Sequence, residues 1–268
     1  MTEVRWERLT APELKDLAAR GALVVLPVAS LEQHGPHLPV WTDSALGHAM
    51  SVRAAEIATD VPAVVLPVMW LGLSEHHFPF GGTISLDYAT FAGVLRCVLR
   101  CVVRSIMACG FKRLFLVNSH GGNIEPLAVA SRELAHEFGI PVATTSLPRV
   151  AAKEIAAILE TQPGVQHACE AETALWMHLD PTQVRMDKLA GAGSQGGNLG
   201  NPEVTRFWSF AERAPGTGVR GTPEAATPEK GARLAAVISE GLARAMRDPV
   251  LWTTPDPVWM VGRAQSSP

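Results

Sequence analysis

The sequence has little charge and no long apolar run. Lysine, arginine, aspartate and glutamate together make up 18% of its 268 residues, and the formal net charge is −3. Without a basic excess the chain offers no field that would attract nucleic acid. No apolar run reaches the roughly 20 residues of a membrane span, and the polar start lacks the apolar core of a signal peptide. We therefore expect no nucleic-acid and no membrane partner, and the low charged fraction points to buried subunit interfaces.

Cysteine is also scarce, with only Cys97, Cys101, Cys109 and Cys169 in the chain. Cys97 and Cys101 are four residues apart in an apolar stretch with helical periodicity, so we expect them to be reduced core residues. No cysteine pair accompanies them with the spacing of a metal site. This usage is typical of a reducing compartment, and we predict a cytoplasmic protein.

Strand-like and helical segments alternate along the chain. Apolar runs predict strands at 22–28, 63–68, 113–117 and 141–146, and helical periodicity predicts helices at 10–20, 44–58, 87–108, 125–138, 151–159, 170–178 and 228–246. This order predicts an α/β fold, a mostly parallel sheet flanked by helices on both faces, in a three-layer α/β/α arrangement. We expect one compact domain over 1–268, with a tail from about 250 that lies on the surface or at an interface.

Metal-binding side chains follow directly after the first predicted strand. The segment 30–43 contains Glu32, His34, His37 and Asp43, so the end of a buried strand would deliver them to the mouth of the sheet. Oxygen and imidazole donors without cysteine suit a borderline or hard divalent ion such as zinc, manganese or iron. Two alternatives stay open, because Asp43 could cap the next helix and Glu32 could be a solvated loop carboxylate.

A second cluster repeats this arrangement. Ser119-His120-Gly121-Gly122-Asn123 lies between the strand predicted at 113–117 and the helix predicted at 125–138. Ligands of open α/β sheets bind at the carboxyl ends of strands, so two such ends imply one shared site. A glycine turn after a strand could also be a phosphate nest, but its pairing with the first cluster favours a metal.

Five segments resemble, in the expected order, the motifs of the creatininase (creatinine amidohydrolase) family. They are Glu32-Gln-His-Gly-Pro-His-Leu-Pro with Thr42-Asp43, and the stretches 72–85, 118–123, 167–173 and 218–231. The resemblance runs over most of the chain. It implies a creatininase-like fold, two divalent ions per subunit, with zinc favoured and manganese or iron as alternatives, and a homohexamer.

The resemblance also implies a set of five metal ligands, which are Glu32, His34, Asp43, His120 and Glu172. Asp43 would bridge the two ions, because a carboxylate has two oxygens with several lone pairs. In creatininase a glutamate two residues after the second-motif histidine completes one shell, but this chain has Gly122 there. We assign that place to Glu172, which could otherwise be an intrahelical or capping carboxylate.

His167 and Glu170 are the catalytic candidates. The resemblance implies that His167 lies beside the metals and acts as a general acid toward the leaving nitrogen, or holds the tetrahedral intermediate by a hydrogen bond. It could instead be a histidine at a helix start that bonds a carbonyl. Glu170 would share the acid–base work or orient His167, and as a first-turn residue it could equally serve the helix dipole.

Loops supply the candidates for substrate binding, since glycine-rich loops commonly line pockets. We predict substrate contacts for Ser74, His76, Gly121 and Trp208, where Trp208 could shape the pocket of this or a neighbouring chain. His37 is expected to support a ligand. The histidines without motif support are interpreted as structural or surface residues: His48, His77, His136 and His178.

These features predict an enzyme that hydrolyses carbon–nitrogen bonds other than peptide bonds. Metal-activated hydroxide would attack a small-molecule substrate, a cyclic amide of the creatinine or lactam type or a small formamide or amide. The alternative is a peptidase of the mycofactocin-type branch of the family, which trims a short precursor peptide. A metal-binding protein without catalysis is a third hypothesis.

Overall fold

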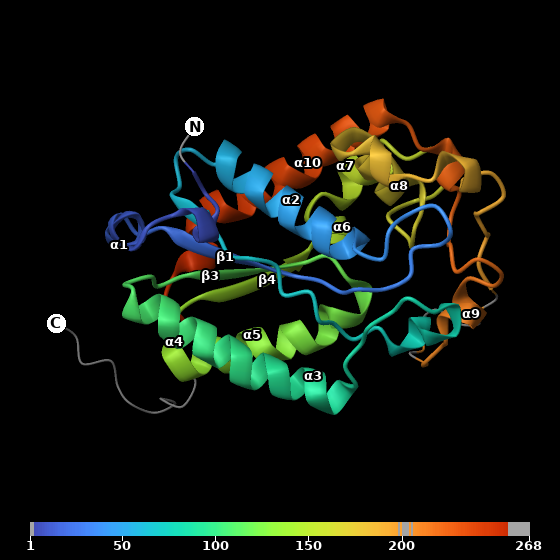
Figure 1. Cartoon of the computed structure of the whole chain (residues 1–268). Helices are drawn as coiled ribbons and strands as arrows, with labels where there is room; N and C mark the ends of the chain where they lie inside the picture. Colours follow the sequence, from blue (N-terminus) through green and yellow to red (C-terminus); the bar gives the residue numbers. More distant parts are fainter. Residues whose placement is uncertain (1–2, 198, 200–203, 205, 257–268) are drawn as a thin grey trace.

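The computed structural model describes residues 3–197, 199, 204 and 206–256 (Figure 1). Its centre is a sheet of four parallel strands in the order β2-β1-β3-β4. The strands are β1 Leu23–Val28, β2 Ala63–Val65, β3 Leu114–Asn118 and β4 Val142–Ser146. Every residue of β1 and β3 is buried, as expected where helices cover both faces of a parallel sheet.

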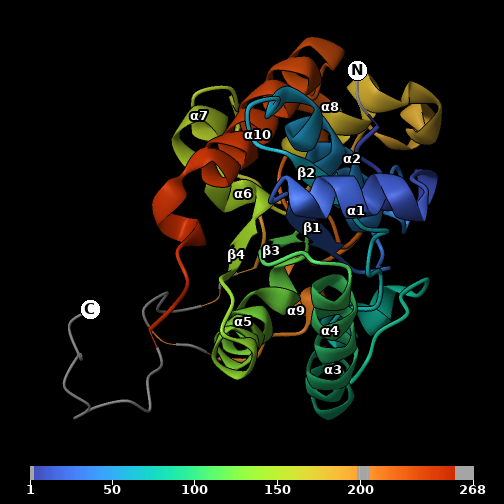
Figure 2. The same ribbon diagram turned by 90° about the vertical axis from the view of Figure 1, so that its left-hand side faces the viewer.

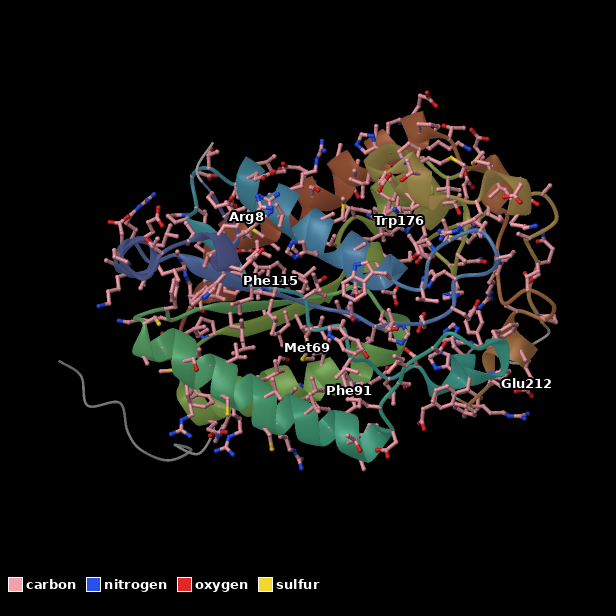
Figure 3. All side chains as sticks on the ribbon, in the orientation of Figure 1. Arg8, Met69, Phe91, Phe115, Trp176 and Glu212 are labelled. Carbon is pink, nitrogen blue, oxygen red and sulfur yellow. The ribbon has the colours of Figure 1, made fainter. Side chains whose placement is uncertain are left out.

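Two helical layers enclose this sheet (Figure 2). One layer holds α2 Thr42–Ile57, α6 Leu147–Val150, α7 Ala152–Ala156, α8 Glu170–Leu179 and α10 Pro228–Arg247. Its buried side chains form a first hydrophobic core with one face of the sheet. A second core, on the other face, is shared by α1 Ala11–Ala19, α3 Tyr88–Val94, α4 Arg100–Ala108 and α5 Ile124–Phe138. Phe115 and Trp176 belong to the first core and Phe91 to the second (Figure 3). The predicted three-layer α/β/α fold is therefore confirmed.

Short elements complete the chain. A π-helical segment, Leu95–Leu99, joins α3 to α4, so the predicted helix at 87–108 is continuous. A four-residue helix, α9 Phe210–Arg213, was not expected. The 3₁₀ helices are Trp6–Arg8, Glu75–Phe80, Gly121–Asn123, Pro181–Gln183, Met186–Lys188, Pro223–Ala225 and Pro249–Trp252. Among the described residues, none of the helices is long and apolar enough to cross a membrane.

One expectation about packing needs correction. Cys97 and Cys101 are exposed, because the buried stripe of their helix runs through Leu95 and Leu99 instead. The described start of the predicted surface tail, residues 250–256, is exposed apart from Trp252. The Trp252 side chain is buried, with its ring 5.6 Å from that of Phe115. The rest of that tail, from residue 257, lies outside the described residues.

Candidate metal centre

The five predicted ligands meet where β1 and β3 end. Their side chains are buried, and their donor atoms form two groups of three in which all atoms lie within 4.8 Å of one another. The first group is Glu32, Asp43 and His120, and the second is His34, Asp43 and Glu172. Asp43 belongs to both groups, as a bridging carboxylate would.

Asp43 is positioned by the start of α2. The helix begins at Thr42 and its N-cap residue is Trp41, so the alternative of Asp43 as the helix cap does not hold. A carboxylate in the first helical turn is favoured by the positive end of the helix dipole. The side chain reaches toward the histidines, with Oδ1 3.3 Å from Nε2 of His34 and Oδ2 3.1 Å from Nδ1 of His120.

Backbone carbonyls orient both histidine ligands. Nδ1 of His34 lies 3.1 Å from the carbonyl oxygen of Glu32, and Nε2 of His120 lies 3.0 Å from that of Leu73. A carbonyl only accepts, so each of these nitrogens carries a proton. In the neutral imidazole the other nitrogen then points its lone pair at carboxylates. Such hydrogen bonds from the outer nitrogen are the usual support of a metal-binding histidine.

Nε2 of His34 is buried and has no hydrogen-bond partner among the described residues. Its neighbours are carboxylate oxygens, Oδ1 of Asp43 and, at 3.9 Å, Oε2 of Glu172. A lone pair aimed at carboxylates is unfavourable unless a proton or a cation lies between them. The donor set of three carboxylates and two imidazoles, without sulfur, therefore fits zinc, manganese or iron ions.

Burial and neighbouring charges together shift the pKa values of the ionisable groups in this cluster. Burial alone would lower the pKa of His34, but Asp43 and then Glu172 and Glu32 outweigh it and raise that pKa to about 9. Burial, followed by the charge of Asp43, raises the pKa of Glu172 to about 7. Metal binding must therefore displace protons from this site, which couples metal affinity to pH.

Gly122 leaves no room for a side chain. A Cβ at this position would lie 2.2 Å from the carbonyl oxygen of Leu73 and 2.6 Å from Nε2 of His120, so the local backbone excludes a glutamate here. The structure brings Glu172 to His34 instead. The backbone N–H of Ala168 donates to Oε2 of Glu172 at 2.5 Å and holds this carboxylate in place.

His167 lies against the same cluster. Its Nε2 is 2.7 Å from the carbonyl oxygen of Gln33, its Nδ1 is 3.5 Å from Oε1 of Glu32, and its ring centroid is 4.2 Å from that of His34. Burial, and then the charge on His34, lower the pKa of His167 to about 3. The imidazole is therefore neutral near pH 7, with its proton on Nε2 and the lone pair of Nδ1 turned toward the ligands.

Glu170 does not join the cluster. Its Oε1 accepts from Nζ of Lys230 at 2.7 Å, and its Oε2 accepts from Oγ1 of Thr161 at 2.7 Å. The backbone N–H groups of Glu160 and Thr161 also donate to this carboxylate. Glu170 thus connects the segment that precedes α8 with helix α10. Because its carboxylate binds these groups and not the metal ligands, its position argues against the expected acid–base role.

The four residues that were predicted to contact the substrate differ in their burial and in their distance from the metal ligands. Ser74 is buried behind His120, with Oγ 3.1 Å from Nε2 of that histidine, so it supports a ligand. His76 is partly buried, and its ring centroid lies 5.8 Å from that of His120. Gly121 begins a 3₁₀ helix in open space. Trp208 is half-buried, and its substrate contact stays a prediction, as do those of His76 and Gly121.

His77 is a site residue that the sequence reasoning missed. Its Nε2 lies 3.3 Å from Oε1 of Glu32, and its Nδ1 lies 2.9 Å from Nε2 of Gln33. The Gln33 amide is oriented by two backbone groups, because its Oε1 accepts from N–H of Gly35 and its Nε2 donates to the carbonyl of Gly218. Gln33 therefore donates to His77, and His77 in turn donates to Glu32.

Phe210 was missed as well. Its ring stacks on His77 at 4.0 Å and meets the edge of His167 at 4.5 Å, so it covers two imidazoles beside the cluster. The ring sits at the start of α9, where Ser209 and Glu212 form a capping box. That Ser-x-x-Glu pattern is visible in the sequence and could have predicted the helix.

A small cavity of about 30 Å³ borders Asp43 and Glu172. It has room for about one water molecule. Most of its remaining wall is apolar: Leu46, Ser119, Leu147, Pro148, Val165, Leu175 and Ile238. This wall desolvates the two carboxylates and so strengthens their electrostatic interactions.

Comparison with known proteins finds one family over most of the chain. The family model described as creatininase, creatinine amidohydrolase, matches residues 7–246. The mycofactocin precursor peptide peptidase of Mycobacterium ulcerans is 32% identical over 237 residues, which are 86% of this chain and 85% of the relative. The creatinine amidohydrolase of Pseudomonas putida is 29% identical over 267 residues, 92% of this chain and 95% of the relative.

Solved creatininase structures share the fold. A mutant described as the Zn-Zn type has a TM-score of 0.72 at 28% identity and covers 93% of this chain and 99% of its own. A structure described as creatininase Mn has a TM-score of 0.73 at the same 28% identity, with 92% and 99% covered. The fold is therefore one that holds zinc or manganese in these proteins.

Proposed function

Because this chain belongs to the creatininase family of metal-binding hydrolases, we propose that it is an amidohydrolase that cleaves a non-peptide carbon–nitrogen bond. The substrate class that we propose is a cyclic amide of the creatinine or lactam type, or a small formamide or amide. The observation that carries this proposal is the position of Asp43, whose two oxygens face two separate groups of donors.

Two divalent ions fit these donors. Glu32, Asp43 and His120 would hold one, and His34, Asp43 and Glu172 would hold the other. When bound, such ions polarise a carbonyl oxygen and lower the pKa of water. The protein keeps its own ligands in place for this chemistry, because backbone carbonyls fix the two histidines and His77 fixes Glu32.

His167 moves the proton. Its Nδ1 is unprotonated near pH 7 and faces the cluster, so it accepts a proton from the attacking water and returns it to the leaving nitrogen. The Nε2–H bond to the carbonyl of Gln33 stabilises the positive charge that His167 carries between these events. This role starts from a neutral imidazole and thus refines the expectation of a simple general acid. Phe210 shields one side of the ring from water.

The test begins with metal-free protein that is reconstituted separately with zinc, manganese or ferrous iron. Bound metal is counted by elemental analysis, and a panel of cyclic amides, ureas and small amides is followed by product mass spectrometry. We expect two ions per chain and ring opening or amide cleavage of at least one compound. Binding of two ions without hydrolysis of any non-peptide amide would remove the proposal.

A peptidase that acts on a short precursor peptide is the second candidate. It is favoured by the identity to the Mycobacterium ulcerans peptidase over most of both chains, and by Gly122 in place of a ligand glutamate. Short peptides therefore belong in the same panel. Cleavage of peptides in preference to cyclic amides would select this candidate.

We also propose a cytoplasmic homohexamer. Supporting observations are three exposed, unpaired cysteines, which suit a reducing compartment, and the exposure of Tyr88, Cys97, Val98 and Cys101 on the α3–α4 helix. Light scattering on the metal-loaded protein is expected to give six times the mass of one chain, and a monomer at micromolar concentration would contradict it.

A further inference from the structure

Two arginines lie beside the metal centre, on elements that also touch its histidines. Arg213 ends α9, and its guanidinium lies 5.9 Å from the ring centroid of Phe210, the ring that stacks on His77. Arg220 is joined to His167 through the backbone, where its N–H donates to the carbonyl of His167 at 2.9 Å. Helix α9 packs against the 3₁₀ helix Glu75–Phe80 at the end of the molecule where the strands finish (Figure 1).

Neither arginine has an acidic partner in the part of the chain that the structure describes. Both side chains are half-buried, and the buried Nε atom of each lacks a hydrogen-bond acceptor among the described residues. Other arginines behave differently, since five of them form ion pairs with carboxylates at 3.1 Å or less: Arg5, Arg96, Arg100, Arg244 and Arg247.

The two guanidinium groups also act on each other. Burial, and then the charge of Arg220, lower the pKa of Arg213. The charge of Arg213 also contributes, after burial and His120, to lowering the pKa of His76 to about 4. Arginine nonetheless stays charged in proteins. Two like charges in a half-buried place are unfavourable unless an anion binds to them.

We propose that Arg213 and Arg220 bind a carboxylate of the substrate, next to the amide that the metal centre cleaves. Arginine suits this task because its planar fork matches a carboxylate and its N–H donors form charge-assisted hydrogen bonds. The inference rests on the proposed hydrolase function and narrows its substrates to amides with a free carboxylate. These would be N-acyl amino acids for the amidohydrolase, or short peptides with a free C-terminus for the second candidate, the peptidase. A neutral cyclic amide would leave both arginines unpaired.

Matched substrates test this proposal. N-acetylalanine is compared with N-acetylalaninamide, and tetra-alanine with its C-terminal amide, on the metal-loaded enzyme. We expect kcat/KM to favour the free acid by about 10- to 100-fold, the size of hydrogen bonds to charged groups. Arg213→Gln and Arg220→Gln should each reduce this preference, mainly by raising KM for the acid. Arg104→Gln, which removes an exposed arginine of α4, should keep the preference.

A binding measurement keeps the test independent of catalysis. Titration calorimetry of N-acetylalanine with the metal-free protein should give a Kd that is at least 10-fold higher for Arg213→Gln and Arg220→Gln than for the wild type and Arg104→Gln. Circular dichroism checks that each variant is folded. If one of the two arginine variants does not fold, the other alone is sufficient for the test. Equal hydrolysis of acid and amide by the wild type overturns the inference and leaves the hydrolase standing. If neither is hydrolysed, the calorimetry decides, and equal binding by all four proteins overturns it.

Discussion

Oδ2 of Asp43 lies 3.1 Å from Nδ1 of His120, and both side chains are buried. The same Asp43 carboxylate turns its other oxygen, Oδ1, to Nε2 of His34 at 3.3 Å. One side chain from the start of α2 thus links a histidine that follows β1 to a histidine that follows β3. Removal of this link should therefore affect both halves of the site at once.

Replacing Asp43 by Ala or Asn should lower the metal content from two ions per chain to one or none. The reason is that Asp43 belongs to both donor groups, and neither alanine nor the neutral amide can bridge two cations. Elemental analysis after dialysis measures the loss. Asp16→Asn, on the exposed face of α1, is the control and should keep both ions. Two firmly bound ions in Asp43→Ala would refute the bridging role.

Replacing His167 by Ala should lower kcat by roughly 10² or more, as expected for loss of a proton carrier. The metal content should stay near that of the wild type, because the five other side chains complete two donor groups without His167, whose ring borders Glu32 and His34. Steady-state kinetics and elemental analysis of the same preparation separate the two effects. If metal and activity disappear together, His167 is a ligand.

Replacing His77 by Leu should weaken metal binding by about 10- to 100-fold, the usual effect of losing a residue that orients a ligand. The His77 imidazole donates to Glu32, and leucine cannot. Competition with a chromophoric chelator measures the affinity. The matched control is His178→Leu in α8, a histidine that belongs to none of the candidate metal groups among the described residues. Similar metal affinities of the two variants would contradict the role of His77.

The sequence predicts the fold and the ligands that follow strands, because both depend on local patterns. Glu32, His34 and His120 come directly after buried strands, so their position at the carboxyl edge of the sheet follows from strand order. His77 is different, since only its tertiary contact with Glu32 shows that it serves the site.

The first turn of α8 shows the same limit. Glu170 and Glu172 are two residues apart, so their side chains leave the helix about 200° apart and cannot serve the same site. The sequence does not say which one faces the metals. The decision depends on Lys230, 60 residues further on, which binds Glu170 and leaves Glu172 beside His34.

The last prediction concerns pH. In the metal-free protein the pKa of Glu172 is raised from 4.5 to about 7, chiefly by burial and next by the charge of Asp43. Between these two values the folded protein binds a proton at Glu172 that the unfolded chain has already released. Folded-state stability from this group therefore falls as the pH rises from about 4.5 to 7, by up to about 3 kcal/mol.

Glu172→Gln isolates this effect, because glutamine resembles the protonated side chain and does not titrate. Urea unfolding in the presence of a chelator should give similar stabilities for the wild type and the variant at pH 5. At pH 8 the variant should be the more stable of the two. Added zinc should reverse the order at pH 8, since only the ionised Glu172 can bind the metal and so stabilise the folded state. A stability difference that is the same at pH 5 and pH 8 would show that Glu172 is not the buried, perturbed carboxylate of this site.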